Sequence, residues 1–504
     1  MTVNFQFPML RAMLESHAAT HGVTNMAKHF RTSVVPSWMV QLVGIVGGVW
    51  MVLGDACAAP PEQAAPNYDA AVRVCREYLA AEDDDERERL ASQLDGYRGD
   101  IESVIRVVAS QTYRPVAAGY HSEEKFQSTE VREKYPRDLL YFVVPKTYDA
   151  SRPTGLIVFM HGGGLTTSRD APESTLRFPL PDSPPDTYRS GDMLAATGMI
   201  TVGPSAPGKW ESSYRWCLHS SEAYLAAVIA DCKTRFNIDP DLVFLLGHSM
   251  GGFGAFHHAL RQPDRFAAII SCAGAWDCGY WPVIRGTPLC MIQGIHDAQR
   301  GGRWHHTDVE YARWSHKIFT RANLDHVYYE YDGVHDFAEM RPKVAEYLAS
   351  NKQLRRDPFY PHITLASPQG FAWNYLHRVR HNRWLTLDET TSGTLEYDDL
   401  TTSGDDFDSW RLEHSLTNHR GAMIDAINRG KNRIDVTTQN VARFTIWLHP
   451  KMVDVAQPVT VSVDGTVQFT GRVKPSLKTA LESYARRQDW GLIYPIKITL
   501  PAND

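Results

Sequence analysis

Several features common in other protein classes are scarce or missing in this 504-residue sequence. Its seven cysteines include no C-x-x-C pair, and no group of histidines and cysteines has the spacing of a zinc finger. The net charge is −6, and no basic patch of the size that nucleic acids require is present. Internal repeats and low-complexity tracts are also absent. We therefore expect no nucleic-acid partner and no repeat architecture.

Hydrophobic residues, by contrast, make up 43% of the chain. This content is ample for buried cores, and the length allows two or three domains. The acidic run at residues 82–86 is short and is typical of a solvated helix junction rather than of a binding tail.

The first 58 residues have the features of an export signal. Residues 32–54 carry no charge and include a nearly continuous apolar run, and small residues at the −3 and −1 positions precede Ala59. Translation from Met26 would give a signal peptide of ordinary length. We expect an exported protein, periplasmic or secreted, that contacts a membrane only if this segment stays uncleaved.

Cleavage before Ala59 leaves an even number of cysteines, which permits disulfides in an exported chain. The six are Cys75, Cys217, Cys232, Cys272, Cys278 and Cys290. Cys272 and Cys290 lie in apolar, strand-like runs and are also typical of ordinary core residues.

The most informative segment is residues 241–252, Asp-Leu-Val-Phe-Leu-Leu-Gly-His-Ser-Met-Gly-Gly. An apolar run of strand length enters a G-x-S-x-G turn centred on Ser249, and a helical pattern follows. This combination is the nucleophile elbow, a tight turn that exposes a serine hydroxyl at the top of a sheet. Glycines flank the serine because the turn leaves no room for neighbouring side chains. The pattern predicts Ser249 as a nucleophile.

A serine nucleophile needs a base and an acid that orients the base, in the chain order Ser, Asp/Glu, His. Residues 288–292 form a strand-like run shortly before Asp297, and residues 327–331 form another before His335. Both side chains follow the carboxyl ends of strands, where open α/β sheets place their sites. We predict Asp297 as the orienting acid and His335 as the base.

Residues of the same types compete for these roles. Asp beside Gly is usual in turns, so nearby aspartates have a structural explanation. No rival histidine combines the right chain order with a position just past the last parallel strand. The rivals are Asp332 and Asp336 for the acid, and His296, His305, His306 and His326 for the base.

A glycine-rich turn supplies donors for the oxyanion. The strand-like run 156–160 leads into His161-Gly162-Gly163-Gly164. One backbone N–H of this loop, with the N–H of Met250 after the nucleophile, would form the oxyanion hole. Gly162 and Gly163 are the candidate donors, with Gly163 preferred. The alternative is an ordinary glycine-rich turn.

Residues of about 138–350 resemble the α/β-hydrolase superfamily. The resemblance is carried by residues 234–240, the Gly-His-Ser-Met-Gly-Gly turn, and residues 262–268 and 272–275. It points in particular to secreted esterases similar to feruloyl esterases and polyhydroxybutyrate depolymerases, and also to catalytic domains of prolyl-oligopeptidase-type peptidases. It implies a doubly wound, mostly parallel sheet and a Ser-His-Asp triad.

After residue 355 the pattern changes to strand-length runs. Residues 459–463 and 467–470 flank Asp464-Gly465, which predicts a hairpin turn. We expect a β-rich, sandwich-like C-terminal domain with one helix over 477–486. The predicted organisation is a signal peptide at 1–58, a helical N-terminal element at 59–112, an α/β-hydrolase catalytic domain at 113–355 and the β-rich domain at 356–504.

The sequence thus predicts an exported serine hydrolase that cleaves a small-molecule or polymer-linked carboxylic ester through an acyl-enzyme, with no cofactor or metal. A serine peptidase would use the same triad. About 80 mature residues precede the hydrolase sheet, too few for a propeller with blades of about 40 residues, and this favours the esterase. The third hypothesis is an inactive hydrolase-fold binding protein, which a fluorophosphonate probe would leave unlabelled. Nothing in the sequence indicates an oligomeric state.

Overall fold

The computed structural model describes residues 67–163, 176, 190–205, 215–297, 306–351, 353–368, 379–404 and 411–502. The predicted export segment, Gly164 and His305 lie outside these residues, so export stays a prediction. Among the described residues, no helix has both the length and the apolar character needed to cross a membrane. Residues Ala64–Asp504 belong to one compact unit.

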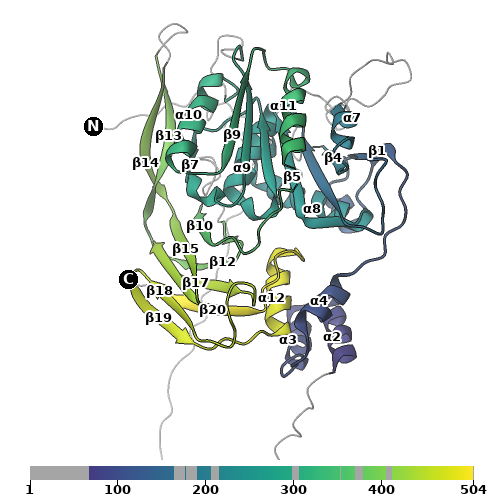
Figure 1. Cartoon of the computed structure of the whole chain (residues 1–504), viewed down its shortest axis with the longest axis vertical. Coiled ribbons are helices and arrows are strands. Elements are labelled where there is room, and N and C mark those ends of the chain that lie inside the picture. The colour runs from purple at the N-terminus through teal and green to yellow at the C-terminus, as the bar shows by residue number, and fades with distance from the viewer. Residues whose placement is uncertain are drawn as a thin grey trace, which may run out of the picture. The chain divides into compact units, whose positions relative to one another are not determined.

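An eight-stranded sheet occupies the centre of the hydrolase-like region (Figure 1). Strand β2 runs antiparallel to both of its neighbours, and all other pairs are parallel. In spatial order the strands are β1 (Gly119–Glu124), β2 (Leu140–Val144), β4 (Ile200–Pro204), β3 (Thr154–Met160), β5 (Ile238–His248), β6 (Ala268–Cys272), β8 (Leu289–Gly294) and β9 (His326–Tyr331). This is the doubly wound, mostly parallel sheet that the sequence predicted.

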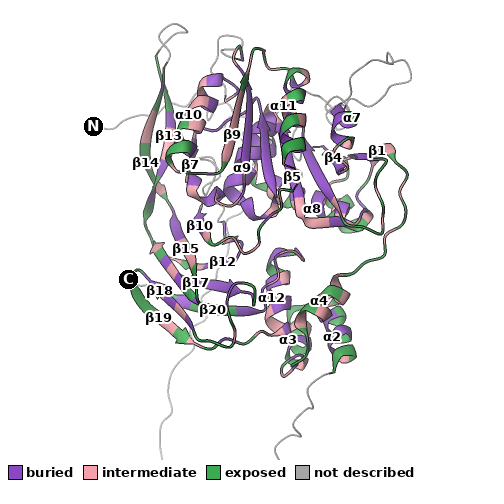
Figure 2. Ribbon diagram, in the orientation of Figure 1, coloured by how far each residue is buried: buried purple, intermediate pink, exposed green. Residues whose placement is uncertain are grey.

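Helices cover both faces of this sheet, and successive side chains of one strand enter different cores. Leu156, Val158 and Met160 of β3 pack with α8, α9 and α10, whereas Ile157 and Phe159 pack with α7 and α11. The central strands are buried on both sides, which explains their continuous apolar sequences (Figure 2). The helices of this region are α5 (Thr129–Lys134), α7 (Ser190–Ala195), α8 (His219–Arg235), α9 (Met250–Arg261), α10 (Val309–Arg321), α11 (Phe337–Ser350) and the 3-10 turns η1 (Arg215–Cys217), η2 (Pro263–Arg265) and η3 (Trp281–Ile284).

The C-terminal region is a β-sandwich, as predicted. One sheet has the order β10-β15-β16-β18-β19 and the other β11-β12-β17-β20, and residues of both sheets share one core. At the predicted hairpin turn Asp464 and Gly465 have φ values of 48° and 81°, the double positive φ of a type I′ turn. The strands are β10 (His362–Ser367), β11 (His381–Asn382), β12 (Leu385–Thr390), β15 (Ala422–Gly430), β16 (Arg433–Gln439), β17 (Val441–Leu448), β18 (Val459–Val463), β19 (Thr466–Gly471) and β20 (Ile496–Pro501).

A third, three-stranded sheet links the two regions. Its long hairpin, β13 (Thr394–Ser403) and β14 (Arg411–Arg420), pairs with the two-residue strand β7 (Cys278–Gly279). Asp399 of β13 lies opposite Cys278 of β7. Because β7 belongs to the hydrolase-like segment, the hairpin extends the C-terminal region onto it by backbone hydrogen bonds.

The N-terminal helices pack against the C-terminal region rather than against the eight-stranded sheet. They are α2 (Tyr68–Ala80), α3 (Asp84–Gln93) and α4 (Ile101–Ala109), and their small core includes Leu477 and Leu481 of α12 (Leu477–Arg487) (Figure 1). The acidic run opens α3, where the Asp83 side chain accepts a hydrogen bond from the N–H of Glu86 at 2.8 Å. Acidic residues are favourable at a helix N-terminus.

The cysteines answer a question that the sequence left open. All six cysteines of the described chain are buried, and none of them forms a disulfide in the structure. Cys272 and Cys290 lie on adjacent strands, but Cys272 faces Ile292, so the two are out of register. Burial raises the pKa of the Cys75 thiol to about 12. These are core residues, the alternative explanation that the sequence allowed for Cys272 and Cys290.

A buried arginine joins the two regions. Arg356, in the connection before β10, donates to Asp241 of β5 at 2.7 and 2.9 Å and to Asp489, just after α12, at 2.8 and 3.2 Å. Its side chain is fully buried, and that of Asp489 is 5% exposed. Despite the cost of burial, the neighbouring cations Arg356 and Lys233 hold the pKa of Asp489 well below its usual range.

We expect Arg356→Met to lower the free energy of unfolding by about 3–5 kcal/mol, because two carboxylates would lose their buried cation. The neighbouring variant Arg355→Met provides the control. Arg355 pairs with Asp239 but is 51% exposed, so its loss should change stability by about 1 kcal/mol or less. Urea denaturation of both variants measures the difference. Equal losses of stability would contradict the assignment of Arg356 as the residue that joins Asp241 and Asp489.

Candidate active site

Ser249 stands at a strained turn between β5 and α9. Its φ and ψ are 56° and −114°, a backbone conformation that side-chain-bearing residues rarely adopt and that costs about 1–3 kcal/mol. The Ser249 N–H donates to the Cys272 carbonyl of β6 at 2.9 Å, which holds the turn against the sheet. The strain lifts the serine side chain out of the end of β5, as the elbow motif predicts.

Two glycines make this turn sterically possible. A Cβ added to Gly247 would lie 2.0 Å from the Gly251 carbonyl oxygen, and one added to Gly251 would lie 2.0 Å from the Met160 carbonyl oxygen. Both distances are far inside van der Waals contact with backbone atoms that cannot move away. The motif glycines are therefore required by close packing between α9, β5 and β3.

The structure brings Ser249, His335 and Asp297 into one hydrogen-bonded chain. Ser249 Oγ lies 2.8 Å from His335 Nε2, and His335 Nδ1 lies 2.6 Å from Asp297 Oδ2. Because a carboxylate only accepts, Nδ1 carries the proton and Nε2 is left to accept the serine proton. Asp297 is fully buried, and the His335 side chain is 15% exposed. All three side chains follow the carboxyl ends of parallel strands β5, β8 and β9.

Gln293 positions the acid, a role that the sequence did not reveal. Its side-chain amide donates to Asp297 Oδ2 at 3.1 Å and to the Thr307 carbonyl at 2.7 Å. The Asp297 carbonyl in turn accepts from the Val309 N–H at 3.0 Å. The available signal was a glutamine in an otherwise apolar strand end four residues before the acid.

His248 holds the loop that carries His335. Its Nε2 donates to the His335 carbonyl at 2.8 Å. Burial, and after it nearby His335, lower the pKa of His248 to about 4, so the ring is neutral near pH 7. A neutral ring can fix the loop without placing a second positive charge beside the His335 imidazole.

The rival residues have other partners in the structure. Asp332 pairs with His296 at 2.7 Å on the surface, where their side chains are 86% and 60% exposed. Asp336 caps α11 by accepting from the Ala338 N–H at 2.9 Å. His306 Nε2 lies 3.3 Å from Asp277, and His326 lies 2.8 Å from His316. His305 lies outside the described residues.

The predicted oxyanion loop borders the serine. A Cβ added to Gly162 would lie 3.4 Å from Ser249 Cβ. Buried His161, whose pKa is lowered to about 3 by burial, is neutral and donates from Nδ1 to the Gly162 carbonyl at 2.6 Å. In a planar trans peptide the next N–H points opposite to that carbonyl, so this bond directs the Gly163 N–H away from His161. Met250 is the first residue of α9, where N–H groups have no partner within the helix.

Comparison with known proteins agrees with this architecture. Residues 137–317 match the esterase family model, described as "Putative esterase". The matched segment carries an α/β-hydrolase fold. The resemblance stated from the sequence is thereby confirmed, and the family match supports a hydrolase. No curated protein matches the chain.

Solved structures similar to this chain include esterases and peptidases. They include a thermostable esterase (18% identity, 44% of this chain and 60% of that one, TM-score 0.32). A feruloyl esterase module from Clostridium thermocellum is 14% identical over 47% of this chain and 93% of that one, with a TM-score of 0.34. Dipeptidyl peptidase 4 of Porphyromonas gingivalis is 16% identical over 49% of this chain and 37% of that one, with a TM-score of 0.34. Identities and TM-scores this low do not indicate which bond this chain cleaves.

Proposed function

We propose that this α/β-hydrolase cleaves carboxylic esters through a covalent acyl-enzyme on Ser249. The observation that carries the proposal is the hydrogen-bonded chain from Ser249 Oγ through His335 to buried Asp297, with Ser249 on the strained turn between β5 and α9. The match of residues 137–317 to an esterase family supports the ester as the bond cleaved.

In the first half of the reaction Ser249 Oγ attacks the ester carbonyl carbon while its proton passes to His335 Nε2. Asp297 stabilises the imidazolium that forms, and the carbonyl oxygen becomes an oxyanion. In this proposal the N–H groups of Gly163 and Met250 donate to that oxyanion, with the N–H of Gly162 as the alternative loop donor. Collapse of the intermediate breaks the C–O bond, and His335 returns its proton to the leaving alcohol.

Water completes the cycle. His335 Nε2 accepts a proton from a water molecule as its oxygen attacks the acyl carbon, and the same backbone donors hold the second oxyanion. Breaking the bond to Ser249 Oγ releases the carboxylic acid, and His335 reprotonates the serine. Each step uses only side chains and backbone groups of this chain.

A hydrolysis screen tests the reaction class. We expect p-nitrophenyl acyl esters, or feruloyl or acetyl esters of polysaccharides, to be hydrolysed with a kcat/KM of about 10⁴ M⁻¹s⁻¹ or more for the preferred substrate. Short peptides should not be cleaved. His335→Ala should abolish the ester activity, whereas His296→Ala, a change to a surface histidine, should preserve it. Cleavage of peptides alone would overturn the ester proposal and leave a peptidase.

A further inference from the structure

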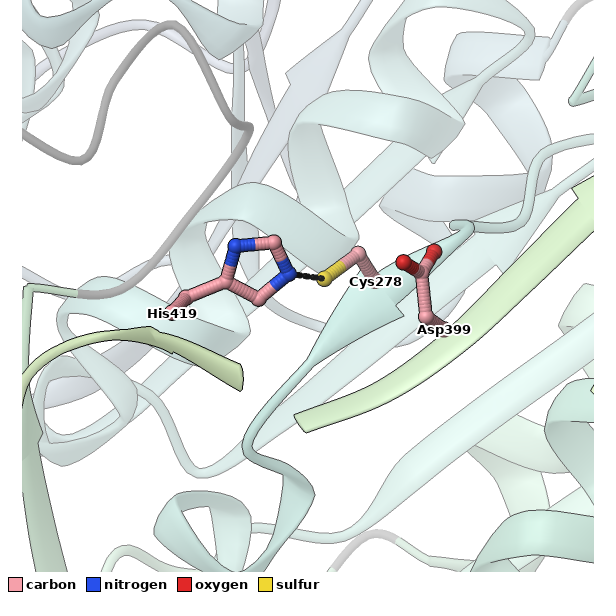
Figure 3. A group of neighbouring side chains, drawn as sticks. All are labelled: Cys278, Asp399 and His419. Carbon is pink, nitrogen blue, oxygen red and sulfur yellow. Dashed lines mark hydrogen bonds between the residues drawn. The ribbon is translucent and has the colours of Figure 1, made fainter. Parts of the chain in front are cut away.

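Three potential metal ligands from distant parts of the chain meet beside the three-stranded sheet. The ligand atoms of Cys278, Asp399 and His419 all lie within 4.8 Å of one another (Figure 3). Cys278 Sγ and His419 Nε2 are 3.9 Å apart. Cys278 is 7% exposed, and the other two residues are partly buried. None of them belongs to the Ser249 site.

The strand register explains the convergence. Asp399 lies opposite Cys278 across the β13–β7 pair, so their side chains share one face of the sheet. On β14, Thr417 and His419 lie opposite Tyr397 and Leu395. Residues two apart on a strand point to the same side, which places Leu395, Tyr397 and Asp399 with Thr417 and His419 on that face. The His419 side chain, which starts opposite Leu395, lies along this face with its Nε2 3.9 Å from Cys278 Sγ.

The geometry is unsuited to a second catalytic thiol. In a Cys–His–acid arrangement the acid must contact the imidazole nitrogen that does not face the thiol. Here Cys278 faces Nε2 of His419. The Thr417 hydroxyl bridges Asp399 to that same nitrogen, because it lies 2.9 Å from Asp399 Oδ2 and 2.8 Å from His419 Nε2. All the polar groups therefore converge on a single point instead of forming a relay.

We propose that Cys278, Asp399 and His419 bind a zinc ion. Thiolate, carboxylate and imidazole are the zinc ligands of proteins, and tetrahedral coordination places such atoms roughly 3.5 Å apart. The 3.9 Å between Cys278 Sγ and His419 Nε2 is within a few tenths of an ångström of that spacing. One thiolate and one carboxylate also balance the two positive charges of the ion.

An ion at this site would link the two regions of the chain. Cys278 belongs to the hydrolase, whereas Asp399 and His419 belong to the hairpin of the C-terminal region. An ion on these three ligands would fasten β7, β13 and β14 together, with the fourth position open to water. The Thr417 hydroxyl donates to Asp399 and would orient this carboxylate as an outer-shell partner, while the ion would replace the contact of that hydroxyl with His419 Nε2.

The wild-type protein, expressed with zinc in the medium and purified without chelator, provides the first test. We expect about one zinc ion per chain by mass spectrometry of the metal. After exchange with cobalt(II), a thiolate-to-cobalt charge-transfer band should appear in the near ultraviolet, because Cys278 is the proposed sulfur ligand. Removal of the ion should lower the melting temperature. A protein that neither contains zinc nor binds added zinc or cobalt would overturn the proposal.

Variants locate the ion. Cys278→Ala and His419→Ala should lose the bound zinc, and Cys278→Ala should also lose the charge-transfer band. The control is His414→Ala, which removes another histidine of β14 that bonds Asp398 at 2.8 Å and stacks on Trp314. It should destabilise the hairpin yet keep the zinc. Equal zinc content in His419→Ala and wild type would overturn the assignment.

Thr417→Val is a further test that keeps the proposal measurable if the ligand variants do not fold. It preserves shape and all three ligands, and it should weaken zinc binding by about 10–100-fold, measured by competition with a chelator. Unchanged affinity would remove Thr417 from the site. Ester hydrolysis by Ser249 is measured in parallel. If no hydrolysis is found, the proposed function fails, but the measured zinc content still tests the zinc site independently.

Discussion

Ser249→Ala is expected to lower kcat for ester hydrolysis by about 10⁶-fold. Without the hydroxyl no acyl-enzyme can form, and only the oxyanion donors and substrate binding remain to assist water. The loss should appear in steady-state turnover of a p-nitrophenyl ester. It should also abolish labelling by a fluorophosphonate probe, which modifies activated serines.

The matched control is Ser271→Ala on the neighbouring strand β6. Ser271 is buried, whereas Ser249 is partly exposed, and the Ser271 hydroxyl donates to the Gly274 carbonyl at 2.8 Å. This variant should keep the probe labelling. Labelling that persists in Ser249→Ala would show that another residue is the nucleophile, and unlabelled wild-type protein would favour an inactive hydrolase-fold binding protein.

Asp297→Asn is expected to lower kcat by about 10⁴-fold while the protein stays folded. An asparagine amide would present an N–H to His335 Nδ1, so Nδ1 would have to accept and the ring proton would move to Nε2. His335 could then no longer accept the proton of Ser249. The amide nitrogen would stand where Oδ2 now accepts from both His335 and Gln293, so the hydrogen bond from Gln293 would be lost as well.

Asp332→Asn provides the comparison, because this is the acid that the sequence left open as an alternative. Its carboxylate is 86% exposed and pairs with His296 on the surface. We expect near wild-type turnover for this variant. If Asp332→Asn were inactive and Asp297→Asn near wild type, the acid assignment would be wrong.

The elbow was predictable because its determinants are local. The turn needs small residues within two positions of Ser249, and the collision of a Cβ at Gly247 or Gly251 with backbone atoms shows why glycine is required there. The hairpin turn at Asp464-Gly465 was predictable for a similar reason, since few residue pairs adopt two positive φ values in succession.

The positions of Asp297 and His335 were predictable from a rule of topology. Parallel strands present their carboxyl ends at one edge, so residues that follow β5, β8 and β9 meet there although they are up to 86 positions apart. The supporting residues escaped prediction. Gln293 contacts Asp297, and His248 contacts the His335 loop, through a single hydrogen bond each, and a polar residue in an apolar strand end does not by itself reveal its partner.

The sequence by itself determined the hydrolase sheet, the elbow, the three aligned side chains and the β-sandwich, because apolar periodicity and turn chemistry are written in neighbouring residues. Only the tertiary structure decided that the described cysteines form no disulfide, that Arg356 joins Asp241 to Asp489, and that Cys278 meets Asp399 and His419. These contacts join segments more than 100 residues apart. Their partners are chosen by the register of strands and the docking of whole regions, and local sequence does not encode those choices.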